Sequence, residues 1–125
     1  MEFIGPQKRD NLLEYYQNCD IFVMPSLFEP VGFTAIEAMA CGKVVIVSSN
    51  SGIAERIVDR VSGFLVKPGD ADDLAEKIHF ILKQSIDQRR KIAESARNAV
   101  RQQSFEHIGR RLEDLYSRVI HLTYN

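Results

Sequence analysis

Short apolar runs alternate along the chain with segments in which apolar residues recur at helical spacing. Such alternation is typical of βα units that build a parallel sheet. Strands are predicted at Glu2–Ile4, Ile21–Met24, Lys43–Ser48 and Gly63–Val66. The pattern therefore predicts an α/β fold, with a Rossmann-like open parallel sheet of about four strands and helices on its flanks.

Helices are predicted between and after these strands from the helical period of their apolar positions. Their ranges are Asp10–Asn18, a helix from the end of the Ser26–Gly32 loop to Ala40, a short helix from Ser51 to Val58, a helix capped by Asp70, Ile86–Gln102, and a last helix that Ser104 caps. The pattern is helical only after Asp70, so residues 104–122 are expected to form a helical C-terminal tail. We interpret residues 1–125 as a single domain, since this length suffices for one core.

The composition argues against several classes of protein. With 45% hydrophobic and 26% charged residues and a formal net charge of −1, the chain resembles a soluble globular protein and shows no sign of a nucleic-acid partner. No apolar run approaches the roughly 18 residues that a membrane-spanning helix needs. Cys19 and Cys41 are too far apart for a Cys-x-x-Cys motif, so we expect two reduced thiols and a cytoplasmic location.

Motifs for common cofactors and nucleophiles are absent from the sequence. It has no P-loop, no Gly-x-Gly-x-x-Gly fingerprint and no Gly-x-Ser-x-Gly elbow, and its histidines show no metal-ligand spacing. Asp70-Ala71-Asp72 has the Asp-x-Asp form of one type of metal site. It follows Pro68-Gly69 at a helix start, however, where acidic residues cap free N–H groups. We therefore expect neither a metal nor a cofactor.

The loop that joins the second predicted strand to its helix is the best candidate for a ligand site. Ligands of open parallel sheets bind outside the carboxyl ends of the strands, and residues 25–33 occupy that position. Gly32 would let a ligand approach the backbone closely. The N–H groups of Phe33 and Thr34, which begin the helix, could then hold a phosphate without any basic side chain.

Two glutamates bracket this helix start. Glu37 lies one turn after Phe33 on the same helix face, and its two oxygens could accept hydrogen bonds from the two hydroxyls of a ribose. Glu29, in the loop, could accept hydrogen bonds from the hydroxyls of a sugar. The alternative is that Gly32 is only a turn residue, Glu29 is solvated, and Glu37 is an ordinary exposed helix residue.

The stretch PSLFEPVGFTAIEAMACGKVVIVSSNSGIAERI, residues 25–57, resembles the signature of the family-4 retaining glycosyltransferases with the GT-B fold. That signature contains Pro-Ser, Glu-Pro-x-Gly, Glu-Ala-Met-Ala, a glycine, a strand, and a Gly-rich turn that ends in glutamate. The flanking segments FIGPQKRDNLLEYYQNCDIFVMPS and GFLVKPGDADDLAEKI are also similar to that family. The resemblance covers nearly the whole chain and implies an incomplete GT-B C-terminal domain, the part that binds the nucleotide-sugar donor.

The resemblance also implies roles for individual residues. Glu29 would contact hydroxyls of the transferred sugar and is the candidate catalytic residue, while Glu37 would hold the ribose hydroxyls. The backbone around Gly32, Phe33 and Thr34 would hold the diphosphate. The complete donor-binding set is Glu29, Pro30, Val31, Gly32, Phe33, Thr34 and Glu37. The family transfers a hexose from a UDP-, GDP- or ADP-sugar to an acceptor hydroxyl with retention of configuration and without a bound metal.

The chain departs from the family pattern in three respects. Val31 stands where the family usually has an aromatic residue, and Ser51-Gly52 replaces a usual Gly-Gly. The N-terminal acceptor domain, the first strands of the C-terminal domain and a basic Arg/Lys pair that grips the diphosphate have no counterpart here. We expect the acceptor domain to be a partner in cis or a separate chain, the isolated chain to be inactive, and the full enzyme to be cytoplasmic, either free or peripheral to a membrane.

Two other interpretations remain open from the sequence. The chain could be a non-catalytic α/β interaction module in which Glu29 and Glu37 are structural. It could also belong to a GT-B relative with another reaction, such as a sugar-nucleotide epimerase. The spacing of the two glutamates favours transfer, by family likeness.

Overall fold

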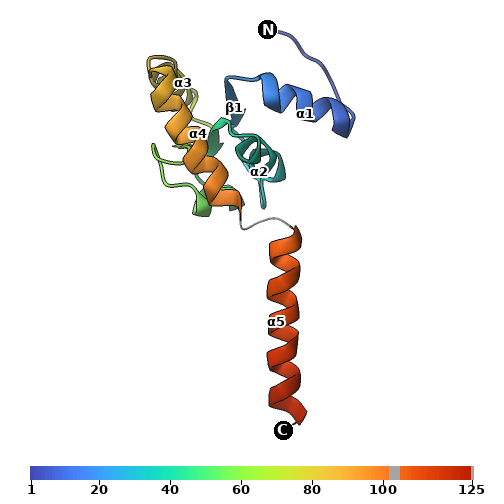
Figure 1. Ribbon diagram of the computed structural model, residues 1–125. Helices are drawn as coiled ribbons and strands as arrows, with labels where there is room; N and C mark the ends of the chain where they lie inside the picture. The colour runs from blue at the N-terminus through green and yellow to red at the C-terminus, as the bar shows by residue number, and fades with distance from the viewer. Residues whose placement is uncertain (102–104, 125) are drawn as a thin grey trace.

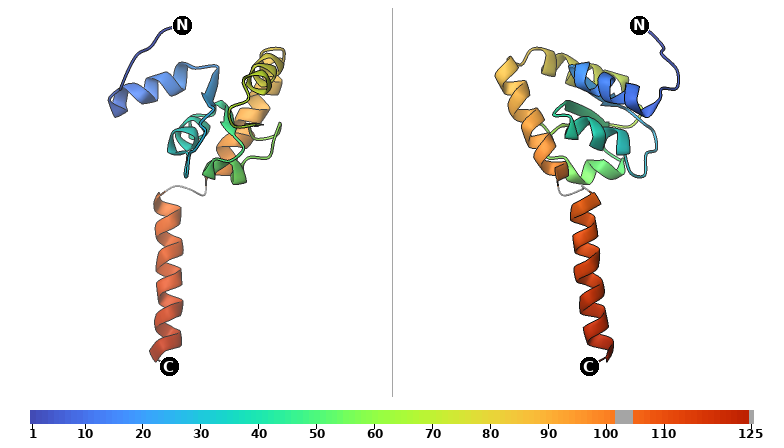
Figure 2. Two further views of the ribbon diagram at one scale, coloured as in Figure 1. Left: turned by 180° about the vertical axis from the view of Figure 1, so that it is seen from behind. Right: turned by 45° about the vertical axis from the view of Figure 1, so that its right-hand side comes forward.

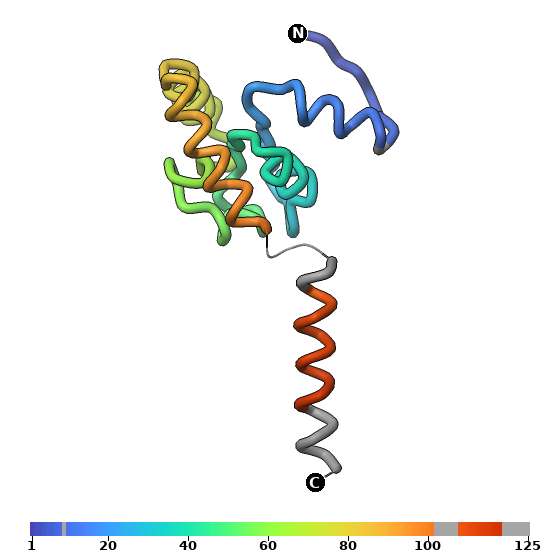
Figure 3. Tube along the Cα trace, viewed as in Figure 1, coloured from blue at the N-terminus to red at the C-terminus, as the bar shows by residue number. Residues whose placement is uncertain are grey.

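The structure is a computed structural model that describes residues 1–101 and 105–124 (Figure 1). Its elements are α1 (Arg9–Asn18), β1 (Ile21–Met24), α2 (Phe33–Ala40), β2 (Val44–Ser48), the 3-10 helix η1 (Gly52–Arg56), β3 (Phe64–Val66), α3 (Ala71–Leu82), α4 (Ile86–Val100) and α5 (Phe105–Tyr124). The Cα trace runs from α1 into β1 and then, through one loop, into α2 (Figure 3). The predicted alternation of strands and helices is confirmed.

The sheet is parallel and has the strand order β1-β2-β3. Ile46 at the centre of β2 lies opposite Val23 in β1 and Phe64 in β3. Every residue of β2 is buried, which explains why its sequence is a continuous β-branched run rather than an alternation of apolar and polar residues. Burying each such side chain contributes roughly 1.5–3 kcal/mol relative to leaving it exposed.

Helices cover both faces of the sheet (Figure 2). On one face, Val45 and Val47 of β2 pack in a core cluster with α1 and α2. On the other face, Val44 and Ile46 pack against α3. The α4 helix contributes to both clusters, so it joins the two layers of the core. These layers hold β1 and α2 in place, and with them the loop that connects the two elements.

Two of the predicted elements differ from the structure. Residues 2–4 are not a strand, and the side chains of Met1 and Phe3 are exposed. A strand exists only where a second strand supplies its hydrogen bonds, and the described part of the chain places none beside this segment. The predicted short helix after Ser51 is shorter than expected and is a 3-10 helix. The Ser104 cap lies outside the described residues.

The C-terminal helix α5 extends away from the α/β layers in all views (Figures 1 and 2). It carries exposed apolar side chains, namely Ile108, Leu112, Leu115 and Tyr116. In the described part of the chain, no other element therefore packs against the apolar face of this helix. None of the described helices is both long and apolar enough to cross a membrane.

Candidate functional site

Gly32 begins α2 in a conformation that other residues rarely adopt. It is the N-cap residue, with a φ of 84° in the left-handed region, and it is buried. A Cβ atom at this position would lie 2.8 Å from Cγ2 of Ile53 and 3.3 Å from Cε of Met24. The turn into the helix therefore needs glycine both for its backbone angle and for its packing.

Glu29 folds back onto its own loop. Its Oε1 atom accepts hydrogen bonds from the backbone N–H groups of Val31 at 3.2 Å and Gly32 at 2.9 Å. The Glu29 side chain is half-buried, and Oε2 has no hydrogen-bond partner among the described residues. The carboxylate is thus not simply solvated, because one oxygen orders the turn before α2 while the other stays available.

Gly52, which begins η1 after the end of β2, closes the same loop. Its N–H group donates to the backbone oxygen of Glu29 at 2.9 Å. A Cβ atom on Gly52 would lie only 2.0 Å from the backbone oxygen of Pro30. Ser51, by contrast, fits as it is, since its buried hydroxyl donates to the Ser48 carbonyl at 2.7 Å. Of the two positions that are usually glycine in the family, the packing here requires glycine only at 52.

The first turn of α2 has free backbone donors. The first N–H group that bonds within the helix is that of Ile36, which donates to the Gly32 carbonyl at 3.1 Å. The N–H groups of Phe33 and Thr34 have no acceptor in the described chain, and no side chain caps them. The side chain of Phe33 is 68% exposed, so this end of the helix opens to solvent. Free N–H groups and the positive end of the helix dipole suit an anion.

Glu37, one turn further along α2, is held by a residue of α1. The hydroxyl of Tyr16 donates to Oε2 of Glu37 at 2.9 Å. Tyr16 is only 7% exposed, and burial, followed by the hydrogen bond and charge of Glu37, raises the pKa of its phenol from 10.0 to about 12. The phenol is therefore a neutral donor over the whole physiological range.

The pattern of apolar and polar residues did not predict this contact of Tyr16. A signal was present, because a buried tyrosine hydroxyl nearly always has a hydrogen-bond partner. The pattern could not name that partner, which lies 21 positions further along the chain. A cavity of about 340 Å³ lies beside the pair, lined by Asp10, Leu12, Leu13, Tyr16, Glu37, Ala40 and Cys41.

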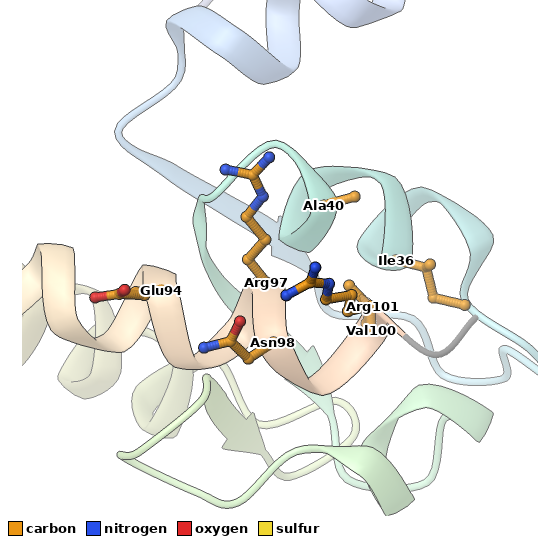
Figure 4. Close-up of a pocket in the computed structure, with 7 residues that line it drawn as sticks. All are labelled: Ile36, Ala40, Glu94, Arg97, Asn98, Val100 and Arg101. Atoms are coloured by element: carbon orange, nitrogen blue, oxygen red, sulfur yellow. The ribbon is translucent and has the colours of Figure 1, made fainter. Parts of the chain in front are cut away.

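A second cavity, of about 620 Å³, lies between α2 and α4 (Figure 4). Arg97 of α4 and Arg101, the C-cap residue of that helix, line it together with Ile36 and Ala40 of α2. The guanidinium of Arg97 extends toward the Ala40 end of α2 (Figure 4). Phe33 and Thr34 do not line this cavity, so it does not include the free N–H groups at the start of α2.

The Asp-x-Asp segment that begins at Asp70 has a structural role. Asp70 is the N-cap of α3, and its Oδ1 accepts a hydrogen bond from the N–H group of Asp73 at 2.9 Å, which confirms the capping interpretation of the Asp-x-Asp. Across residues 1–101 and 105–124, no three His, Cys, Asp or Glu side chains gather as metal ligands would.

The fold and this loop define the class of protein. A parallel sheet that presents a free helix N-terminus beyond the carboxyl end of a strand has the arrangement with which open α/β sheets, nucleotide-binding domains among them, bind ligands. The family model described as "Glycosyl transferases group 1" matches residues 1–99. The chain belongs to this family of glycosyltransferases, and it corresponds to part of the C-terminal domain of the GT-B fold.

Individual relatives agree with this assignment. An N,N'-diacetylbacillosaminyl-diphospho-undecaprenol alpha-1,3-N-acetylgalactosaminyltransferase of Campylobacter jejuni is 38% identical over 112 residues, which are 90% of this chain and 30% of that protein. A D-inositol 3-phosphate glycosyltransferase of Mycolicibacterium vanbaalenii is 39% identical over 80 residues, or 64% of this chain and 18% of that protein. The chain thus spans less than a third of the length of either relative.

Solved structures show the same fold. The sucrose-phosphate synthase of Thermosynechococcus elongatus matches 98% of this chain and 31% of its own, with a TM-score of 0.84 and 33% identity. HepE of Anabaena in complex with UDP matches 84% of this chain and 29% of its own, with a TM-score of 0.74 and 27% identity. HepE has also been solved in complex with UDP-glucose.

Proposed function

We propose that the β1–α2 loop and helix α2 form part of the donor site of a retaining glycosyltransferase. The complete enzyme transfers a hexose from a nucleoside diphosphate sugar to an acceptor hydroxyl. The observation that carries this proposal is the open start of α2, where Gly32 and two free N–H groups lie between two glutamates. The complexes of HepE with UDP and UDP-glucose support a nucleotide-sugar donor.

In this proposal the diphosphate binds the N–H groups of Phe33 and Thr34. Gly32 makes the left-handed turn that begins the helix, although Ile53 and Met24 fill the space where its side chain would be, and Pro30 and Val31 shape the loop. Glu29 contributes Oε2 to hydroxyls of the sugar, because its Oε1 is engaged by the loop. Glu37 contributes Oε1 to the ribose hydroxyls, because its Oε2 is engaged by Tyr16. Each glutamate therefore has one oxygen for the protein and one for the donor.

The chemistry that the family resemblance suggests needs no bound metal. The acceptor oxygen forms a bond to the anomeric carbon on the same face from which the diphosphate oxygen departs, so the configuration is retained. The acceptor proton passes to the departing phosphate. The free N–H groups and the dipole of α2 stabilise the negative charge that grows on the leaving group.

The partner in this reaction is an acceptor-binding domain, supplied in cis or by a separate chain. The length of the relatives supports such a domain, since the chain matches only 30% of the Campylobacter protein. We place the enzyme in the cytoplasm, either free or peripheral to a membrane. The free thiols of Cys19 and Cys41 support a reducing compartment.

An NMR titration of the full chain with UDP, GDP and ADP tests the donor site. We expect chemical-shift changes at Gly32–Thr34 with at least one nucleotide, and weaker binding in Glu37→Ala. Glu76→Ala, which removes an exposed glutamate of α3, is the matched control and should bind as the wild type does.

The alternative of a non-catalytic module gains support from the internal partners of Glu29 and Glu37, which a purely structural role also explains. In that case no nucleotide shifts the signals of the loop at millimolar concentration. That result would reject the donor site.

A further inference from the structure

The Tyr16–Glu37 pair connects two helices that are separate in the sequence. The hydrogen bond of 2.9 Å joins α1 to α2 across 21 positions. It engages Oε2 of the carboxylate, while Oε1 has no hydrogen-bond partner among the described residues. A carboxylate that is held at one oxygen keeps a fixed direction at the other.

The donor in this pair is itself rigid. The Tyr16 ring is buried in the core and lies edge-on to Phe22, with 5.8 Å between the ring centroids. Its hydroxyl therefore points in one direction, set by the packing of α1 against β1 and α2. A glutamate on a helix surface would otherwise sample several rotamers, and binding a ligand would cost the entropy of selecting one.

The surroundings of the pair are open on one side. The cavity of about 340 Å³ between α1 and α2 is bordered by both side chains. Glu37 is half-buried, so its carboxylate is reachable from this space, whereas Tyr16 is not exposed enough to bind a ligand by itself. The geometry thus separates the two roles, with Tyr16 supporting the carboxylate and Glu37 presenting it.

We propose that Tyr16 is a positioning residue of the donor site, whose hydroxyl holds Glu37 in the orientation that presents Oε1 to the two ribose hydroxyls. This inference rests on the proposed function, because it assumes that Glu37 binds the ribose. It adds that α1, which contributes no direct ligand contact here, sets the affinity of the site for a ribonucleotide. A core phenylalanine would fill the same space but would leave Glu37 unsupported.

The experiment compares Tyr16→Phe with Tyr15→Phe in the full chain. Tyr15 is the neighbouring exposed tyrosine of α1 and serves as the matched control. The affinity of each variant is measured for the one of UDP, GDP and ADP that binds the wild type, and for its 2′,3′-dideoxy analogue. We expect Tyr16→Phe to weaken the binding of the ribonucleotide roughly three- to ten-fold, the size of one typical net hydrogen bond, because Tyr16 acts on the ligand only through the orientation of Glu37. The dideoxy analogue should bind Tyr16→Phe and wild type equally.

A double-mutant comparison tests whether Tyr16 acts on the ligand through Glu37. On a Glu37→Ala background, adding Tyr16→Phe should change the ribonucleotide affinity no further, since the group that Tyr16 positions is gone. The folding of each variant is followed by its dispersed amide spectrum and by urea unfolding, so that a loss of stability is not mistaken for a loss of affinity.

The outcomes distinguish this inference from the proposed function. If Glu37→Ala weakens the ribonucleotide and Tyr16→Phe does not, Tyr16 has no positioning role although the donor site stands. Equal weakening of both nucleotides by Tyr16→Phe means a general structural effect and also overturns the inference. If no nucleotide binds, or if Glu37→Ala binds the ribonucleotide as the wild type does, the ribose role of Glu37 fails and the inference fails with it.

Discussion

The two glutamates that flank the start of α2 are held in different ways. Glu29 is bound by N–H groups two and three positions away, within its own turn. Glu37 is bound by the side chain of Tyr16, which belongs to another helix and lies 21 positions away. The side chain of Glu29 is therefore oriented within its own turn, and Gly52 closes the loop at the Glu29 backbone oxygen. The orientation of the Glu37 side chain depends instead on how α1 packs. Substitutions should separate these two kinds of support.

The largest expected effect is that of Gly52→Ala on the loop of Glu29. The added Cβ atom would lie 2.0 Å from the Pro30 carbonyl oxygen, and a backbone atom cannot rotate away as a side chain can. We expect the free energy of unfolding to fall by about 3 kcal/mol, together with a displacement of the loop. Urea unfolding and the amide signals of residues 29–34 measure the two effects.

The control for this substitution is Gly109→Ala, because a Cβ atom on Gly109 in α5 meets nothing within 4 Å. It should leave the signals of the loop unchanged. Equal stability of Gly52→Ala and the wild type would show that the loop tolerates a different path, and the account of Gly52 as the residue that closes the loop would then be wrong.

An intermediate effect is expected when the side chain of Glu29 is shortened. Glu29→Ala removes the acceptor for the N–H groups of Val31 and Gly32, which should lower the free energy of unfolding by about 1–2 kcal/mol. Glu29→Gln keeps one acceptor oxygen and should lose less. Thermal or urea unfolding of the two variants tests this order, and a Gln variant as unstable as the Ala variant would contradict it.

The smallest effect at neutral pH is that of the Tyr16 phenol, whose ionisation changes the stability only at high pH. Its pKa is about 12 in the folded chain against an ordinary value of 10.0, so the folded state holds this proton more tightly than the unfolded state. The resulting stabilisation is fully present below pH 10 and is lost as the pH rises through about 12. The stability of wild type should therefore fall more than that of Tyr16→Phe over this interval.

Ultraviolet absorbance of the phenolate provides the direct measurement, since the chain has four tyrosines. One of them should titrate near pH 12 in the wild type and be missing from Tyr16→Phe. In Glu37→Ala the pKa of Tyr16 should be lower than in the wild type but still raised, because burial is the largest cause of the shift. A Tyr16 phenol that titrates near 10 would rule out the buried hydrogen bond.

The sequence alone predicted the features that depend on neighbouring residues. The β-branched run of β2, the helix that follows Gly32, and the cap that Asp70 forms all match the structure, because each depends on spacing or backbone preference within a few residues. The stretch from Glu29 to Thr34 also identified the candidate site, since its Pro, Gly and helix start are adjacent in the chain.

Tertiary structure decided the features that depend on distant partners. The segment Glu2–Ile4 has the composition of a strand but is not one, because a strand needs a second strand alongside it. The requirement for glycine at position 52 arises only because Pro30 packs against it. The hydrogen bond from Tyr16 to Glu37 exists because β1 and the core bring α1 beside α2, and no local pattern encodes that approach.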